Sequence, residues 1–81
     1  MQVRVRLFAA LRETAGRSNL ALELPEGSTP EDVFRRLAAE HPDLGSKRKS
    51  LAAAVNRRYS RFDAPLRDGD EVVFIPPVSG G

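Results

Sequence analysis

The sequence has no cysteine, no tryptophan and only one histidine. Without cysteine, the chain cannot form a disulfide, a zinc ribbon or an iron–sulfur site, and it has no thiol nucleophile. A single histidine cannot supply a multi-histidine metal cluster. The 81 residues suffice for one small domain but leave no room for an internal cavity of enzyme size. We therefore expect one domain that holds no metal or cofactor of its own.

Long apolar runs are also missing, and no segment approaches the roughly 20 residues of a membrane span. Near the N-terminus Arg4 and Arg6 interrupt the apolar residues, which is untypical of a secretory signal. We therefore expect a cytoplasmic protein without membrane contact. The formal net charge is only +2, because 11 acidic residues offset 13 basic ones. We therefore do not expect a nucleic-acid partner.

Two segments alternate between apolar and polar side chains, residues 2–8 and 18–24, as half-buried strands do. Residues 9–16 between them are too few for a crossover helix, so we expect an antiparallel pair. The inward side chains of the first strand are predicted to be Val3, Val5 and Leu7.

A helix is predicted to begin after Thr29, a good N-cap residue, with Pro30 in the first helical position. Apolar residues then recur at helical spacing until His41-Pro42, where proline ends the helix. The single histidine, His41, is well placed to cap this helix end as a cation. Residues 43–50 are predicted to form a polar connector.

Short strands are predicted over residues 51–55 and 71–75, and another short strand is predicted to follow a turn at residues 56–58. The fold class is therefore α+β: a single-domain, ubiquitin-like β-grasp with a mixed sheet packed on one main helix. We expect the domain to span residues 1–75 and residues 76–81 to form a flexible, extended tail.

Three further features have ordinary structural explanations. Asp68-Gly69-Asp70 is predicted to be a turn, because the other ligands of a calcium loop are missing. Lys47–Lys49 is predicted to be a solvated part of the connector, with a phosphate or RNA contact as the alternative. No glycine-rich phosphate loop and no catalytic constellation is present.

The end of the chain is the strongest candidate for chemistry. Pro76 and Pro77 favour an extended segment, which Val78 and Ser79 continue. Gly80 and Gly81 remove every side chain near the α-carboxylate, so this group could enter a narrow channel of another protein. An ATP-using partner could convert the carboxylate to an acyl adenylate, and a sulfur nucleophile could then displace AMP to leave a thiocarboxylate. The alternative is a frayed end without function.

An apolar patch is predicted beside the root of this tail. Phe8 continues the alternation of Arg4 and Arg6, so its ring is expected on the solvent-facing side of the first strand. Val73 and Ile75 are expected to point outward from the last strand. An apolar patch with a polar rim is typical of a protein interface. The alternative is that Phe8 ends its strand and packs into the core.

Several segments resemble one known family: Ala54-Val55-Asn56, Asp63 to Leu66, Asp68 to Val72 and Phe74 to Gly81, with weaker matches nearer the N-terminus. Together they resemble the MoaD/ThiS sulfur carriers, and most of all the small subunits of molybdopterin synthase. The resemblance covers nearly the whole chain and is most specific in its last third.

This resemblance implies a mechanism and partners. A MoeB-type enzyme would adenylate Gly81 with ATP, and a desulfurase system would supply the sulfur of the thiocarboxylate. The MoaE-type large subunit, which holds the catalytic pocket, would accept the tail. Sulfur would pass to cyclic pyranopterin monophosphate to form molybdopterin. Partner contacts of the family correspond to Phe8, Tyr59 and Ile75, and Arg12 would meet an acidic residue of a partner.

Three other functions stay open at this point. The same carrier chemistry could serve thiamine synthesis or tRNA thiolation. A Gly-Gly end equally suits a ubiquitin-like modifier conjugated to lysines. Basic residues at 47–49, 57–58 and 61 could bind RNA, although few aromatic side chains are available to stack on bases.

Overall fold

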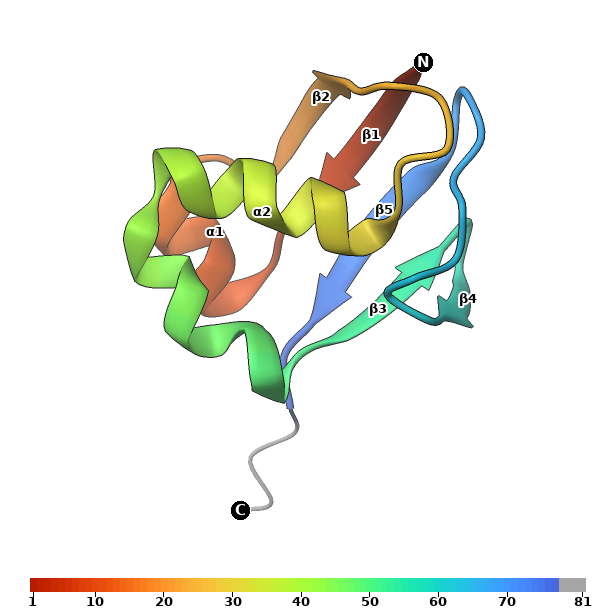
Figure 1. The fold of residues 1–81 in the computed structure, drawn as a ribbon. Coiled ribbons are helices and arrows are strands. Elements are labelled where there is room, and N and C mark those ends of the chain that lie inside the picture. Colours follow the sequence, from red (N-terminus) through yellow and green to blue (C-terminus); the bar gives the residue numbers. More distant parts are fainter. Residues whose placement is uncertain (78–81) are drawn as a thin grey trace.

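A computed structural model describes residues 1–77 of the chain (Figure 1). Its elements in chain order are β1 (Gln2–Arg6), α1 (Ala9–Ala15), β2 (Asn19–Glu23), α2 (Pro30–Glu40), the 3₁₀ helix η1 (Pro42–Ser50), β3 (Ala52–Val55), β4 (Arg58–Ser60) and β5 (Glu71–Ile75). The strands form one sheet in the order β2-β1-β5-β3-β4. The helices cover one side of this sheet, and the other side is open.

The pairing of the strands confirms the predicted β-grasp. β1 and β2 are antiparallel, with Val3 opposite Leu22, while β1 and β5 are parallel, with Val5 opposite Val72. β5 also pairs antiparallel with β3, which in turn pairs antiparallel with β4. The last strand therefore occupies the middle of a mixed sheet, between the first strand and the β3–β4 hairpin.

The hydrophobic core lies between the sheet and the helices. Val3, Val5 and Leu7 are buried as their alternation predicts. Two buried aromatic rings and one partly buried ring belong to this core: Phe74 meets Phe34 edge to face at 5.5 Å between centroids and stacks on Phe62 at 5.9 Å. Pairs of this kind add to the stabilisation from buried apolar area.

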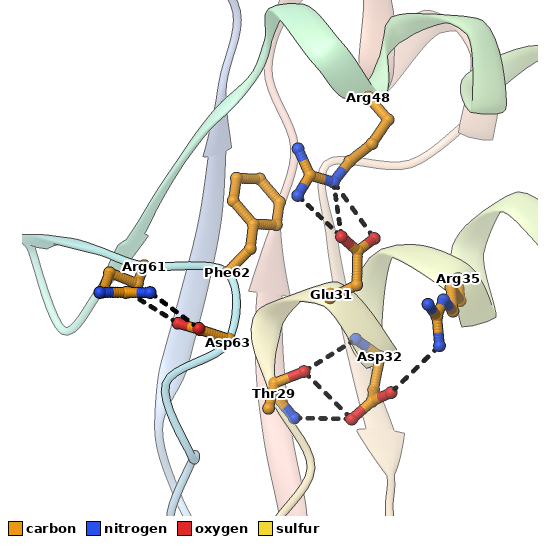
Figure 2. A pocket seen from close by; sticks show the side chains of 8 residues that line it. All are labelled: Thr29, Glu31, Asp32, Arg35, Arg48, Arg61, Phe62 and Asp63. Carbon is orange, nitrogen blue, oxygen red and sulfur yellow. Dashed lines mark hydrogen bonds and ion pairs between the residues drawn. The ribbon is translucent and has the colours of Figure 1, made fainter.

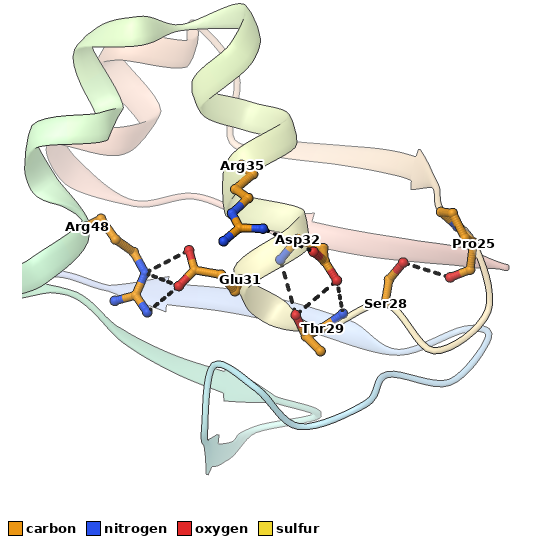
Figure 3. A network of polar contacts seen from close by, with 7 residues as sticks. All are labelled: Pro25, Ser28, Thr29, Glu31, Asp32, Arg35 and Arg48. Atoms are coloured by element: carbon orange, nitrogen blue, oxygen red, sulfur yellow. Dashed lines mark hydrogen bonds and ion pairs between the residues drawn. The ribbon is translucent and has the colours of Figure 1, made fainter.

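The predicted start of α2 is confirmed in atomic detail (Figure 3). The Thr29 hydroxyl accepts a hydrogen bond from the Asp32 backbone N–H at 3.3 Å, and the Asp32 carboxylate accepts one from the Thr29 backbone N–H at 2.9 Å. This capping box satisfies two N–H groups that a helix start leaves unpaired. The helix ends at Glu40, and His41 is its C-cap residue.

One prediction about the connections is incomplete and one is wrong. Residues 9–16 hold no crossover helix, as predicted, but they include the seven-residue helix α1, which buries Leu11 and is capped by Gly16 in the left-handed conformation. Residues 43–50, predicted to be a polar connector, lie within η1 and bury Leu44 completely. Both helices form because one leucine in each packs into the core. The sheet is thus covered by α2 together with α1 and η1, rather than by one main helix alone.

The Asp68-Gly69-Asp70 segment is a turn, as predicted, and it ties the start of β1 to the start of β5. The Gln2 backbone N–H donates to the Asp68 carboxylate at 2.7 Å, and the Gly69 N–H donates to the Gln2 carbonyl at 2.7 Å. Gly69 has a φ of +86°, which glycine adopts without strain. The two aspartates therefore have structural partners within the fold.

The basic segment Lys47–Lys49 is only partly solvated, which corrects its prediction as a solvated connector. The Arg48 guanidinium donates three hydrogen bonds of 2.7–3.1 Å to the Glu31 carboxylate (Figure 2). It also lies 3.3 Å from the centroid of the Phe62 ring. Arg48 thus joins η1 to α2 and to the loop before β5. Within residues 1–77, no helix has the length and apolar character needed to cross a membrane.

Candidate functional site

The open face of the sheet carries the candidate site. One row of residues runs across four strands, because Arg6 pairs with Val73, Val73 with Ala54, and Ala54 with Tyr59. Paired residues of adjacent strands project from the same face of a sheet. The residues of this row line a hollow of about 340 Å³ on the surface. Its lining residues are Arg6, Phe8, Ala54, Arg57, Tyr59, Glu71, Val73 and Ile75.

Phe8 lies on the outside of the protein, so the alternative of a core position is excluded. Phe8 follows β1 after one residue, Leu7, and 43% of Phe8 is exposed. The Arg6 guanidinium lies 5.4 Å from its centroid, a cation–π distance. The next residue, Ala9, has a φ of +51°, where a non-glycine residue is strained. This backbone conformation turns the chain from β1 into α1 immediately after Phe8.

The hollow has an apolar floor and a charged rim. Val73 and Ile75 are partly buried, whereas Tyr59 is 81% exposed. The charged lining residues are two arginines, Arg6 and Arg57, and one carboxylate, Glu71. An exposed apolar area bordered by charge is the usual composition of a protein-binding surface.

The turn between β3 and β4 is fixed to β5 by Asn56. Its side-chain amide donates to the Asp70 carboxylate at 2.8 Å, and its side-chain oxygen accepts from the Glu71 backbone N–H at 3.0 Å. The Asn56 backbone N–H also donates to the Glu71 carbonyl at 2.9 Å. These bonds hold the hairpin that carries Arg57 and Tyr59 beside the strand that carries Val73.

The root of the tail lies at the same hollow. Ile75 ends β5 and lines the hollow, Pro76 is half-buried and Pro77 is exposed. Residues Val78, Ser79, Gly80 and Gly81, for which the sequence predicts an extended reactive tail, lie outside the described residues.

The structure brings together four of the five predicted contact residues: Phe8, Tyr59, Val73 and Ile75. The fifth, Arg12, is an exposed residue of α1 that does not line the hollow. Sequence reasoning missed the positions of Arg57 and Glu71. For Glu71 the signal was present, because it shares the parity of Val73 and Ile75.

A second, larger hollow of about 610 Å³ lies near the start of α2 (Figure 2). Its charged residues pair with one another: Arg48 with Glu31, Arg61 with Asp63, and Arg35 with Asp32. Hydrogen bonds from Arg48 lower the pKa of Glu31, and those from Arg61 lower the pKa of Asp63. Because each charged residue of this hollow is paired with another, we assign these residues a structural role. Residues 1–77 contain no group of three or more acidic or histidine side chains placed to hold a metal ion.

These features define a class of protein: a ubiquitin-like β-grasp domain with an apolar hollow on the open face of its sheet, next to the exit of its C-terminal segment. Comparison with known proteins gives the family. Residues 5–81 match the ThiS family, and the chain belongs to it.

Relatives and solved structures agree with this assignment. A molybdopterin synthase sulfur carrier subunit of Chlamydomonas reinhardtii is 43% identical over 83 residues, covering all of both chains. The crystal structure of the small archaeal modifier SAMP1 from Haloferax volcanii has a TM-score of 0.88 at 27% identity, again over both whole chains. A chain in the complex of subunits 1 and 2 of the molybdopterin-converting factor from Helicobacter pylori has a TM-score of 0.70 at 27% identity, with full coverage of both.

Proposed function

We propose that this protein is the sulfur carrier subunit of a molybdopterin synthase. The position of Ile75 carries the proposal, because this residue both lines the hollow and ends the strand that leads to Gly80-Gly81. A partner seated on the hollow would therefore contact the domain beside the point where the C-terminal segment leaves it. The 43% identity to a carrier subunit of this kind over the full length supports the same function.

The proposed chemistry takes place on the α-carboxylate of Gly81. A MoeB-type enzyme joins a carboxylate oxygen to the α-phosphorus of ATP, which releases pyrophosphate and leaves an acyl adenylate. The terminal sulfur of a persulfide from a desulfurase system then attacks the acyl carbon, and AMP leaves with the oxygen. A thiol next cleaves the sulfur–sulfur bond of this acyl disulfide, which frees the thiocarboxylate and leaves a disulfide on the donor. The resulting thiocarboxylate transfers its sulfur to cyclic pyranopterin monophosphate in the pocket of the large subunit. The carrier thus supplies the sulfur, and its partner supplies the catalytic residues.

In this proposal the hollow is the docking surface for the large subunit. Phe8, Val73 and Ile75 provide the apolar contact, and Tyr59 extends it on the β4 side. Exposed aromatic residues are frequent hot spots of interfaces. Arg12 is proposed to meet an acidic residue at the edge of a wider contact, since it lies outside the hollow itself.

The chemistry is tested by intact mass measurement after incubation with the adenylating enzyme, ATP and a sulfur source. We expect one oxygen of the protein to be replaced by sulfur, and fragmentation to place the sulfur on Gly81. A variant lacking Gly81 is the matched control, and it should stay folded without taking up sulfur. Adenylation without sulfur uptake under these conditions would contradict the proposal.

The docking surface is tested by Phe8→Ala, with Arg58→Ala as the control. Phe8 lines the hollow, whereas Arg58 is an exposed β4 residue outside its lining. We expect F8A to weaken binding to the large subunit about tenfold or more, since truncating an aromatic anchor removes about 1.5–3 kcal/mol. Equal effects of both substitutions would exclude the hollow as the contact.

A protein modifier is the second candidate, and the similarity to SAMP1 favours it. The same adenylated Gly81 would then form an isopeptide bond with a lysine amino group. In that case mass spectrometry of trypsin-digested cellular proteins would show lysines that carry residues 68–81, because Arg67 is the last basic residue before Gly81. Carriers for thiamine synthesis or tRNA thiolation share the loading step, so binding to a thiazole synthase or a tRNA-thiolating enzyme instead of the large subunit would identify them.

A further inference from the structure

The turn between β3 and β4 contains a residue whose side chain the backbone disfavours. Val55 pairs with Arg58, so the loop consists of Asn56 and Arg57, with φ values of +51° and +69°. Two positive φ values define a type I′ hairpin turn, for which Asn-Gly is the preferred pair. Asn56 fits this preference. Arg57 does not, because its Cβ crowds the backbone in the left-handed region.

Strain of this kind is concentrated around the hollow. Among residues 1–77, the non-glycine residues with positive φ are Ala9, Asn56 and Arg57. Ala9 follows Phe8, which lines the hollow, and Arg57 lines it directly. Residues held in sparsely populated conformations often cluster at functional sites. The location of the strained residues therefore directs attention to what the Arg57 side chain does there.

Arg57 has no structural partner that would explain its presence. Among the described residues, no carboxylate lies within 4.0 Å of its guanidinium, whereas Arg48 and Arg61 each have one. Glu71 shares the hollow with Arg57, but the two form no ion pair. The exposed Arg57 guanidinium therefore stands at the rim of an apolar floor with its hydrogen-bonding groups free for an incoming molecule.

The charges of the hollow identify the chemistry that would complement it. Arg6 is engaged with the Phe8 ring at 5.4 Å, and Glu71 is the only acidic residue of the lining. A partner carboxylate placed beside an apolar protrusion would match both the floor and the rim. Arginine suits such a role, since its planar guanidinium can hold a carboxylate through two hydrogen bonds.

We propose that Arg57 is a specificity residue of the docking surface, which pairs with a carboxylate of the large subunit at the rim of the apolar contact. The proposal rests on the proposed function, because the large subunit is the partner that this carrier would meet. This role explains why the strained turn contains an arginine: an unfavourable residue is kept where a charge is needed for recognition.

The experiment combines the stability and the affinity of Arg57→Gly. Glycine relieves the strain, so we expect the midpoint of thermal unfolding to rise by about 4 °C for a domain of this size. The same substitution should weaken binding to the large subunit about fivefold, with a shallower dependence of the Kd on NaCl concentration, because a rim charge acts through electrostatic attraction. Isothermal titration at two NaCl concentrations measures the affinity and its dependence on salt.

Two matched variants separate charge from backbone. Arg57→Lys keeps the charge and the strain but loses the two-bond geometry, so the unfolding midpoint should stay at the wild-type value and the affinity should fall between those of wild type and R57G. Arg58→Gln removes a neighbouring exposed arginine that does not line the hollow, and the affinity should not change.

R57G with wild-type affinity and salt dependence would overturn the specificity role while leaving the carrier function intact. A loss of affinity in R58Q equal to that in R57G would also overturn it, since any arginine of the hairpin would then serve. Failure of the wild-type chain to bind the large subunit would overturn the proposed function, and this inference with it.

Discussion

Replacing Arg48 tests whether the contact between η1, α2 and the loop before β5 stabilises the fold. The Arg48 guanidinium holds the Glu31 carboxylate through three hydrogen bonds and covers the Phe62 ring (Figure 2). Both charged side chains are 30% exposed, so the pair is only partly screened by solvent. We consider Arg48→Met, which keeps much of the aliphatic stem but removes the charge and the planar group.

The expected loss follows from two interactions. A partly buried ion pair with bidentate geometry contributes about 1 kcal/mol. Cation–π contact with the ring contributes about 0.5–1 kcal/mol. We therefore expect R48M to lower the free energy of unfolding by about 1.5–2 kcal/mol, and the unfolding midpoint by about 6–16 °C. Arg61→Gln is the matched control: the Arg61–Asp63 pair has equally short bonds but side chains 83% and 69% exposed, so its loss should not be measurable.

The loss should depend on pH in a defined direction. The hydrogen bonds from Arg48, opposed by the burial of the carboxyl group, lower the pKa of Glu31 below its ordinary value of 4.5. A lowered pKa in the folded protein means that the pair stabilises the fold fully above the unfolded pKa. This stabilisation is lost as the pH falls through the folded value. The difference between wild type and R48M should therefore shrink below about pH 4.5 and leave only the contribution of the ring contact.

Urea unfolding followed by circular dichroism at pH 7 and pH 3 measures these differences. Glu31→Gln should reproduce the part of the loss that disappears in acid. Equal stability of R48M and wild type at pH 7 would refute the proposed contribution. A difference that stayed constant between pH 7 and pH 3 would refute its assignment to the ion pair.

Three further outcomes follow from the local geometry. Thr29→Ala removes the capping box, so unfolding in urea should show a loss of about 1 kcal/mol, and an unchanged midpoint would contradict the cap. Asn56→Ala removes two side-chain hydrogen bonds and a residue suited to positive φ, so we expect a loss of about 2 kcal/mol together with weaker binding to the large subunit. Ala9→Gly should instead raise the free energy of unfolding by about 0.5–1 kcal/mol, and a lower thermal midpoint would show that Ala9 is not strained.

Patterns that depend on neighbouring residues could be predicted from the sequence. The alternation of Val3 and Val5 with arginines determines which face of β1 is buried, because side chains of a strand point to opposite sides in turn. Parity likewise placed Phe8, Val73 and Ile75 at one hollow. The start of α2 was predictable because Thr29 and Pro30 are residues that a helix start requires.

Features that depend on distant contacts could not be predicted. Helix α1 has no side-chain cap and no acidic residue in its first turn, so its formation depends on the burial of Leu11 by the rest of the fold. Leu44 is an isolated apolar residue within a polar stretch, and only the assembled core shows where it packs. Arg48 contacts Glu31 and Phe62 only in the folded protein. In the sequence the basic residues Lys47–Lys49 therefore resembled a solvated connector. The position of Arg57 follows from the turn geometry rather than from parity.

The central position of β5 has a mechanical consequence. Any enzyme that draws the C-terminal segment into a channel pulls on Ile75, the end of a strand bonded to β1 on one side and to β3 on the other. A force along the axis of β5 loads both ladders in shear, so several hydrogen bonds must yield together instead of opening one at a time (Figure 1). An edge strand in the same place would have half of this support. The domain would therefore stay folded while a partner pulled on the segment that leaves it.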